Sequence, residues 1–396
     1  MHFAPGKRPC FIGAGYTSIG RYSQRTMSSQ AKEAASMAIA DAGLQVSDID
    51  GMYIWADPNW GPSAPGDPHV WLNISNFMQD LPWENIKHWM QPDAVAAGSC
   101  SPIQAAALAL GAGACNYAVV VRTGHHPAGV RYRQISGNTA GGNAAFSTAY
   151  GHGVGGSGQS ITYQRYLSKY GAKREEMAGY VLNANRNAQD SPPAVWKGRN
   201  LSLEDYLNAR MIAYPMNIFD NDMPCDGVLS VVMTTEDRAK DTPHPGGYMA
   251  GMAAVPFHMS KTGTVGPLEN TEDMCARMAN NMYASAGLKP SDVDLKHVYD
   301  GFSPMVWMWI EAFGWAPKGE AHAWCQPENI AREGKHPLNT SGGNLGNGRI
   351  HGFTHVWETA VQMMGQAGPR QIPNLHVASC ETGPFGNASC FIVTKD

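Results

Sequence analysis

The sequence is poor in charged side chains, which make up 16% of its 396 residues, where about 25% is typical of soluble domains. Its 29 basic and 33 acidic residues give a formal net charge of −4, so it lacks the broad cationic surface that a nucleic-acid partner requires. Low charge together with 43% hydrophobic residues also argues against disorder. We expect a large, well-buried protein with two or three domain-sized units and no nucleic-acid partner.

The sequence also lacks a CxxC pair, a signal peptide and a long unbroken apolar run. Its eight cysteines are scattered, which indicates reduced thiols and offers no structural zinc site, so no bound metal is expected. The most apolar stretch, residues 102–121, includes Gln104 and Asn116 and favours a buried helix followed by a strand. We therefore expect a cytoplasmic protein with no membrane span.

What the chain does contain is an internal duplication. Residues 28–55 and 270–302 each show an Ala/Met-rich helical pattern, then AGL, then a Ser-Asp-apolar-Asp turn, then a short apolar strand. Gly43 and Gly287 stand at the helix ends, where glycine favours a left-handed cap. The offset of 244 residues is too long for a solenoid and predicts two related α/β halves.

Each half continues with apolar strands that alternate with helices, which predicts sheets covered on both faces. In the first half we expect a helix over 101–112 and a strand over 117–121. In the second half we expect a helix over 351–364 and a strand from 375. A further strand is expected over 226–233, after an irregular Gly- and Tyr-rich insertion.

Four motifs carry a resemblance across nearly the whole chain. They are FIGAGYTSIG near the start, PCDGVLSVVMTTEDRAKD from Pro224, VYDGFS from Val298, and NTSGGNLGNGRIHGFTHVWE from Asn339. In this order and spacing the chain resembles the thiolase superfamily. It is most similar to the sterol-carrier-protein-X-type thiolases and the bacterial lipid-transfer-protein homologues.

The resemblance implies an α/β fold, the thiolase-like five-layer αβαβα architecture with two pseudo-symmetric halves and an inserted loop domain. We assign residues 1–130 and 223–255 to the N-terminal half, 131–222 to the loop domain and 256–396 to the C-terminal half. The resemblance further implies acyl-CoA thioester chemistry, a homodimer, and a small zinc-containing OB-fold partner protein that receives the CoA portion. Coenzyme A enters as part of the substrate, and no bound cofactor is expected.

The catalytic positions depart from the thiolase pattern. Arg349 stands where the resemblance expects the His that polarises the thioester carbonyl, and Tyr299 takes the place of the catalytic Asn or His. Counting back from the strand 117–121 puts the nucleophile at about Ala96. Cys100, just before Ser-Pro, is nonetheless expected near a helix start, where a thiol can be reactive.

These departures make thiolysis difficult and favour a retro-aldol cleavage. Tyr299 would shuttle the hydroxyl proton, if its surroundings lower its pKa from about 10. Arg349 would donate to an oxyanion or hold a carboxylate, and His351 would act as acid/base or oxyanion donor. Asp300 is a further catalytic candidate, or else the cap of the helix that follows it. The resemblance makes the steroid side-chain acyl-CoA aldolases the closest implied activity.

A second group of residues is expected to contact the substrate. His125 follows a first-half strand, at a place where loops of the superfamily approach the site. Gly343 and Gly348 belong to a Gly-rich loop that fits no nucleotide-binding motif but lets the backbone approach a thioester. Cys380 and Gly386 belong to the C-terminal Cys/Gly loop that the resemblance implies.

Three functions stay open from the residues. The first is an acyl-CoA aldolase or lyase acting on a bulky β-hydroxyacyl-CoA without a covalent acyl-enzyme. The second is a thiolase or acyltransferase that uses Cys100. The third is a non-catalytic homologue that binds lipid or scaffolds a partner.

Overall fold

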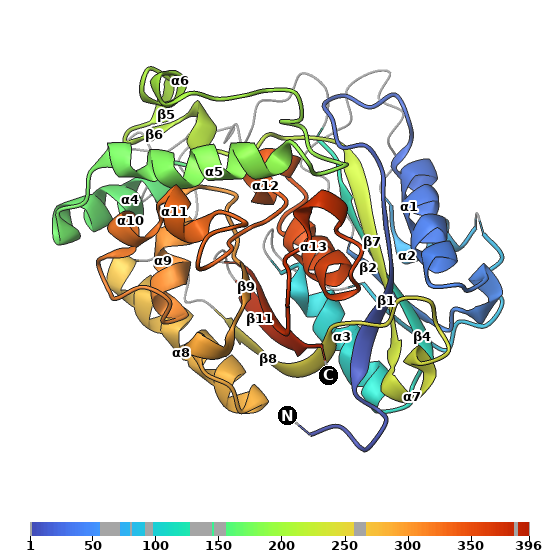
Figure 1. Cartoon of the computed structure of the whole chain (residues 1–396). Coiled ribbons are helices and arrows are strands. Elements are labelled where there is room, and N and C mark those ends of the chain that lie inside the picture. Colours follow the sequence, from blue (N-terminus) through green and yellow to red (C-terminus); the bar gives the residue numbers. More distant parts are fainter. Residues whose placement is uncertain are drawn as a thin grey trace.

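A computed structural model describes residues 2–55, 72–79, 81–91, 98–126, 145, 156–256, 267–383 and 387–395. Within these ranges the strands form two main sheets that lie side by side with helices between them (Figure 1). The first sheet holds, in spatial order, β1 (Pro9–Tyr16), β7 (Gly227–Thr235), β4 (Tyr117–Gly124), β2 (Gly51–Trp55) and β3 (His88–Met90). The second sheet holds β8 (Tyr248–Pro256), β11 (Asn387–Thr394), β10 (Val377–Thr382) and β9 (Leu295–His297).

Helices fill three layers around the two sheets (Figure 1). The outer face of the first sheet is covered by α1 (Met27–Asp41) and α2 (Ile74–Met78). Between the sheets lie α3 (Cys100–Gly111) and α13 (Phe353–Met363), whose apolar side chains form one cluster with both sheets. The outer face of the second sheet is covered by α8 (Leu268–Ala286) and α9 (Pro304–Ala312). The order is α, β, α, β, α, which confirms the expected five-layer α/β fold.

The inserted segment packs on the second half. Its described elements are α4 (Ser157–Tyr170), α5 (Ala178–Ala188), α6 (Leu203–Leu207) and the hairpin of β5 (Met211–Ala213) and β6 (Met216–Asn217). Their apolar side chains share one core cluster with α8 and α9. The shorter helices are α7 (Glu236–Ala239), α10 (Ala321–Trp324), α11 (Pro327–Ile330) and α12 (Gly343–Asn347). The expected assignment put residues up to 255 in the N-terminal half. Because β8 pairs with β11, however, residues 248–256 belong to the sheet of the second half.

The duplicated motifs fold as the same unit twice. The first copy is α1, a 3₁₀ turn over Val46–Asp48 and β2; the second is α8, a 3₁₀ turn over Pro290–Asp292 and β9. Gly43 and Gly287 follow the two helices with φ of +74° and +69°, the left-handed conformation that favours glycine. The opening motif allows close packing, because a Cβ on Gly13 or Gly15 would overlap a carbonyl of α1. No helix in the described ranges is long and apolar enough to cross a bilayer.

Candidate active site

The motifs of both halves meet between the sheets, where β9 and β10 end and α3 begins (Figure 1). Cys100, the first residue of α3, donates its backbone N–H to Thr382 Oγ1 at the end of β10, at 2.8 Å. Tyr299 follows β9, and a Cβ on Gly352 would lie 3.2 Å from its ring. Gly352 comes directly after His351 in the loop before α13. These contacts bring Tyr299, Cys100 and His351 into one site.

The Tyr299 side chain is held in a narrow space between glycines. Tyr299 is 2% exposed, and its backbone N–H donates to Glu381 Oε2 at 3.0 Å. The ring folds back over Gly301, where a Cβ would overlap the hydroxyl. On its other side Gly352, with φ of +87°, leaves room for the ring. The glycine of the YDGF motif is therefore required by the position of the tyrosine.

Asp300 ties the YDGF loop to α5, to α12 in the Gly-rich loop, and to α13. Its buried carboxylate accepts hydrogen bonds from the Tyr180 hydroxyl (2.6 Å), the Asn344 N–H (2.6 Å) and His355 Nε2 (3.1 Å). Burial, and then the Asp300 charge, raise the pKa of the Tyr180 phenol well above its usual range, so it remains a donor. Asp300 does not cap the helix that follows it, because α9 begins after Ser303 without a side-chain cap.

His351 lies between two guanidinium groups. Arg349 Nε donates to His351 Nε2 at 2.7 Å, and an Arg122 amino group contacts Nδ1. Arg122 is fully buried on β4; its guanidinium lies 3.9 Å from the centre of the Trp55 ring and donates to the Trp55 carbonyl at 3.2 Å. Since cations on both sides disfavour a further positive charge, this geometry suits a neutral imidazole that accepts from Arg349.

Two thiols meet at the start of α3. Cys100 Sγ lies 3.8 Å from Cys380 Sγ and 3.7 Å from the Cys380 carbonyl oxygen, and both residues are fully buried. The expected position of Cys100 near a helix start is confirmed. Burial, and then the neighbouring Cys100, raise the pKa of the Cys380 thiol well above its usual range. Ala96 lies outside the described residues.

His125 forms an ion pair with a residue of the PCDG motif. Its Nδ1 lies 2.8 Å from Asp226 Oδ1, and Asp226 Oδ2 accepts the Ser23 N–H at 2.7 Å. Burial would raise the pKa of Asp226, but hydrogen bonds from His125 and two backbone N–H groups outweigh it and lower that pKa. Gly124, just before His125, packs against the Arg349 carbonyl. His125 therefore borders the loop that carries Arg349.

Two glycines of the Gly-rich loop adopt positive φ and also allow close packing of other side chains. Gly343, with φ of +63°, leaves the space that the Asp300 carboxylate fills. Gly348, with φ of +98°, packs against Cys225. Contact of either glycine with a substrate stays a prediction, and Gly386 lies outside the described residues. In the part of the chain that the structure describes, no group of three His, Cys, Asp or Glu side chains could hold a metal ion.

Sequence reasoning missed three residues of this site: Arg122, Asp226 and Glu381. Arg122 left a signal, because it is a single charge within the apolar strand YAVVVRTG. Asp226 belongs to the PCDG motif, but the motif alone assigns it no role. Glu381 is a fully buried carboxyl group, and burial raises its pKa well above the usual range. Its surroundings depend on three other elements and could not be read locally.

Comparison with known proteins agrees with the fold. A family model, Thiolase C-terminal domain-like, matches residues 267–395. The steroid side-chain-cleaving aldolase of Thermomonospora curvata is 28% identical over 374 residues, which cover 92% of each chain. The 17-hydroxy-3-oxo-4-pregnene-20-carboxyl-CoA lyase of Mycobacterium tuberculosis is 26% identical, over 89% of this chain and 91% of that one. The solved structure of the Ltp2-ChsH2(DUF35) aldolase has a TM-score of 0.85 at 25% identity, over 99% of this chain and 98% of that chain.

A layered fold of two duplicated halves with a site between them is that of the thiolase superfamily, and this chain belongs to it. The resemblance inferred from the four motifs is confirmed. Within the superfamily the chain is close to the steroid side-chain-cleaving aldolases.

Proposed function

We propose that the chain is an acyl-CoA aldolase, a carbon–carbon lyase that cleaves a bulky β-hydroxyacyl-CoA by a retro-aldol reaction without a covalent acyl-enzyme. The observation that carries this proposal is the Tyr299 phenol, held between Gly301 and Gly352 where thiolases carry Asn or His. The likeness of the whole chain to a steroid side-chain-cleaving aldolase supports the same reaction and a comparably bulky acyl group. Acyl transfer and a non-catalytic role are not favoured.

The residues of the site suit the charges of this reaction. Tyr299, as its phenolate, takes the proton of the substrate's β-hydroxyl, the Cα–Cβ bond breaks, and its electron pair moves onto the thioester as an enolate. The Arg349 guanidinium stabilises the charge on the thioester oxygen, and His351 orients it by accepting from Nε. The products are a ketone or aldehyde and, after protonation of Cα, a shortened acyl-CoA.

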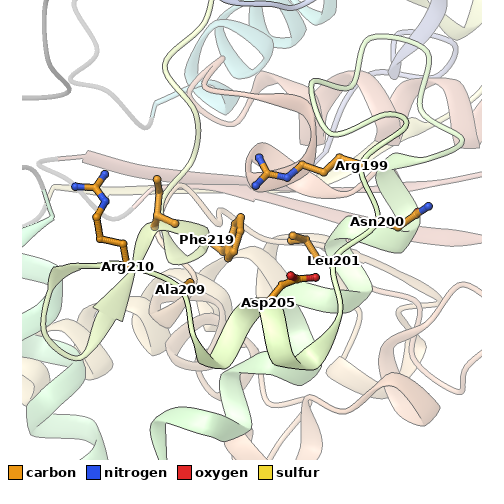
Figure 2. Close-up of a pocket in the computed structure, with 8 residues that line it drawn as sticks. Arg199, Asn200, Leu201, Asp205, Ala209, Arg210 and Phe219 are labelled. Atoms are coloured by element: carbon orange, nitrogen blue, oxygen red, sulfur yellow. The ribbon is translucent and has the colours of Figure 1, made fainter.

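The inserted segment offers a place for the phosphates of CoA. A pocket of about 320 Å³ is lined by Arg199, Asn200, Leu201, Asp205, Ala209, Arg210, Ile218 and Phe219 (Figure 2). The two arginines lie on opposite sides of Phe219, and the Arg199 guanidinium lies 5.0 Å from the centre of the Phe219 ring. Asp205 also lines the pocket, and hydrogen bonds from Ser202, followed by the Arg199 charge, lower its pKa. Guanidinium groups beside an aromatic ring suit a phosphorylated heterocycle.

If this pocket holds the nucleotide end, Arg199→Ala and Arg210→Ala should each raise KM about tenfold while kcat changes less than twofold, since one charge-assisted hydrogen bond is worth about 1.5–3 kcal/mol. Arg238→Ala, on α7 of the first half, is the control and should leave both constants unchanged. Unaltered KM in both pocket variants would place the nucleotide elsewhere.

We also propose that two copies pair through the edge of the first sheet. Among the described strands β3 pairs only with β2, and its residues Trp89 and Met90 are 57% and 40% exposed. An exposed apolar edge strand is a template for pairing with another chain. Light scattering should give about twice the chain mass of 42.7 kDa, and Trp89→Lys should give the monomer. A monomeric wild type would contradict this.

A partner polypeptide is the last part of the proposal. The Ltp2-ChsH2(DUF35) aldolase, which this chain resembles in structure, joins two components in its name. We propose that this chain also works with a separate protein, for which a small zinc-containing OB-fold protein is the candidate. Co-expression should raise soluble, active enzyme. Full activity of the chain purified alone would argue against the requirement.

The reaction type is tested by its need for free CoA. Acyl-CoA substrates are incubated with and without added CoA, and the products are identified by mass spectrometry. Retro-aldol cleavage releases a ketone or aldehyde at the same rate in both samples. Thiolysis consumes CoA, so cleavage that stops without it would establish acyl transfer instead.

A further inference from the structure

Glu381 is a buried carboxyl group that the reaction scheme does not use. It lies near the end of β10, is fully buried, and accepts the Tyr299 N–H through Oε2 at 3.0 Å. Oε1 has no hydrogen-bond partner among the described residues. The Glu381 side chain therefore connects β10 to the backbone of Tyr299, the proposed proton shuttle.

The described groups that surround Glu381 supply no positive charge. Among the described residues its titratable neighbours, besides the Tyr299 phenol, are thiols contributed by α3, α8, β10 and β11: Cys100, Cys275, Cys380 and Cys390. No described Lys, Arg or His forms an ion pair with it. A buried carboxylate with one donor and one bare oxygen is poorly stabilised, whereas a carboxylic acid at the same place costs much less.

A second buried glutamate of the same half shows the opposite arrangement. Glu358 on α13 is also fully buried, but Arg370 donates to both of its oxygens at 2.9–3.2 Å. Thr340 and Gln362 add hydrogen bonds at 2.9 and 3.0 Å. The fold thus builds one site for a carboxylate, at Glu358, and one for a neutral acid, at Glu381.

We propose that Glu381 is a positioning residue that works in its protonated, neutral form, fixing the Tyr299 peptide so that the phenol meets the substrate's β-hydroxyl. This inference rests on the function proposed for Tyr299. An ionised Glu381 would place a buried negative charge beside a phenol that must give up its proton and beside a growing enolate. Cleavage should therefore fall at alkaline pH as Glu381 loses its proton.

The Glu381→Gln variant tests this directly, because its amide oxygen still accepts the Tyr299 N–H but cannot ionise. We expect kcat within about threefold of wild type at neutral pH and an alkaline limb of the pH profile moved upward by at least about one pH unit. Glu381→Ala removes the acceptor and should lower kcat about tenfold or more with little change in KM. Glu358→Gln, the matched control, should lower stability and leave the alkaline limb unchanged.

A measurement without substrate gives a second readout. The pKa of Glu381 is higher in the folded than in the unfolded chain. Its contribution to the free energy of unfolding is therefore fully present below about pH 4 and is lost as the pH rises. Above about pH 4.5, the ratio of folded to unfolded protein for Glu381→Gln should therefore rise relative to that of wild type, by up to about tenfold per pH unit. This arm needs only the purified protein.

The outcomes separate this inference from the proposed function. An alkaline limb in Glu381→Gln equal to that of wild type, with Tyr299→Phe inactive, overturns the inference alone. Full activity of Tyr299→Phe, or cleavage that requires free CoA, overturns the proposed function. Should Glu381→Ala fail to fold, the pH profile and the unfolding curve of Glu381→Gln still decide the question.

Discussion

Each copy of the duplicated unit carries an aromatic side chain at the equivalent position near the end of its strand, but the two side chains make different contacts. Trp55 and Tyr299 stand 244 residues apart, at matching positions of the two strands. Trp55 holds the Arg122 guanidinium on its ring face, and its ring centre is 6.0 Å from that of His351. Tyr299 instead places its ring beside Gly352 and its hydroxyl group beside Gly301. In the proposed reaction the first half supplies a fixed cation and the second supplies the acid–base group.

Behind these positions the scaffold is the same in both copies. Asp50 accepts the N–H groups of the two residues at the start of β4, at 2.7 and 2.9 Å. Asp294, its counterpart, accepts two N–H groups at the start of β10, both at 2.9 Å. The duplicated Asp thus joins two neighbouring strands in each sheet, while the aromatic residues at the far end of the strand differ. Exchanging residues between the copies tests this division.

The largest effect is expected from Tyr299→Phe, which removes the acid–base group and leaves the ring. Carbon–carbon cleavage should fall by about 10²–10⁴, the usual worth of a general acid or base. The free energy of unfolding should change by only about 1 kcal/mol, since one hydroxyl is lost. Tyr53→Phe, in β2 of the first copy, is the control and should retain activity. Near-full turnover of Tyr299→Phe, measured by product formation, would overturn the assignment.

The division between scaffold and site also explains what the sequence could predict. The helix, left-handed glycine, Ser-Asp turn and strand are local patterns, so both copies were found and the elements agree within a few residues. The polar contacts of the site join segments far apart in the chain. Arg122 meets His351 across 229 residues, and Asp300 meets Tyr180 across 120. Such pairs depend on how loops meet, which no local pattern records.

The next largest effect is expected from Lys296→Met, which copies Met52 of the first half. Burial lowers the pKa of Lys296 to about 8, although its ammonium group donates to the Val293 carbonyl at 2.7 Å. The unfolded chain holds this proton more tightly, so the folded state is penalised below about pH 8, and the penalty disappears by about pH 10.4. The variant should be more stable by about 2–3 kcal/mol at pH 7.

Urea unfolding at about pH 7 and about pH 10.4 measures this difference. The gain in free energy of unfolding should be present at the lower pH and absent at the higher one. Lys197→Met, at an exposed position, is the matched control and should show no gain at either pH. A gain of equal size at both pH values would mean that packing, not the buried charge, separates the two copies at this position.

A smaller effect is expected from Trp55→Phe, which weakens the support of Arg122. A buried cation–π contact with Trp is worth up to about 2 kcal/mol, and Phe retains part of it, so kcat should fall about tenfold. KM should change little, because Arg122 acts through His351. Trp83→Phe, a buried tryptophan of the outer layer, is the control. Equal losses in both variants would reduce the role of Trp55 to packing.

The smallest effect is expected from Cys100→Ala, and it decides between the two chemistries that this fold supports. Cys100 begins α3, where a thiol can be reactive, yet it is fully buried in the apolar cluster of the central layer. If no acyl-enzyme forms, the substitution removes only packing, and cleavage should fall less than about tenfold. Cys115→Ala, a buried thiol after α3 in the first half, controls for that packing loss. Rapid denaturation during turnover, followed by mass spectrometry, should find no acyl adduct on the wild type. An inactive Cys100→Ala together with an adduct on Cys100 would instead make the helix start the reaction centre and return the chain to acyl transfer.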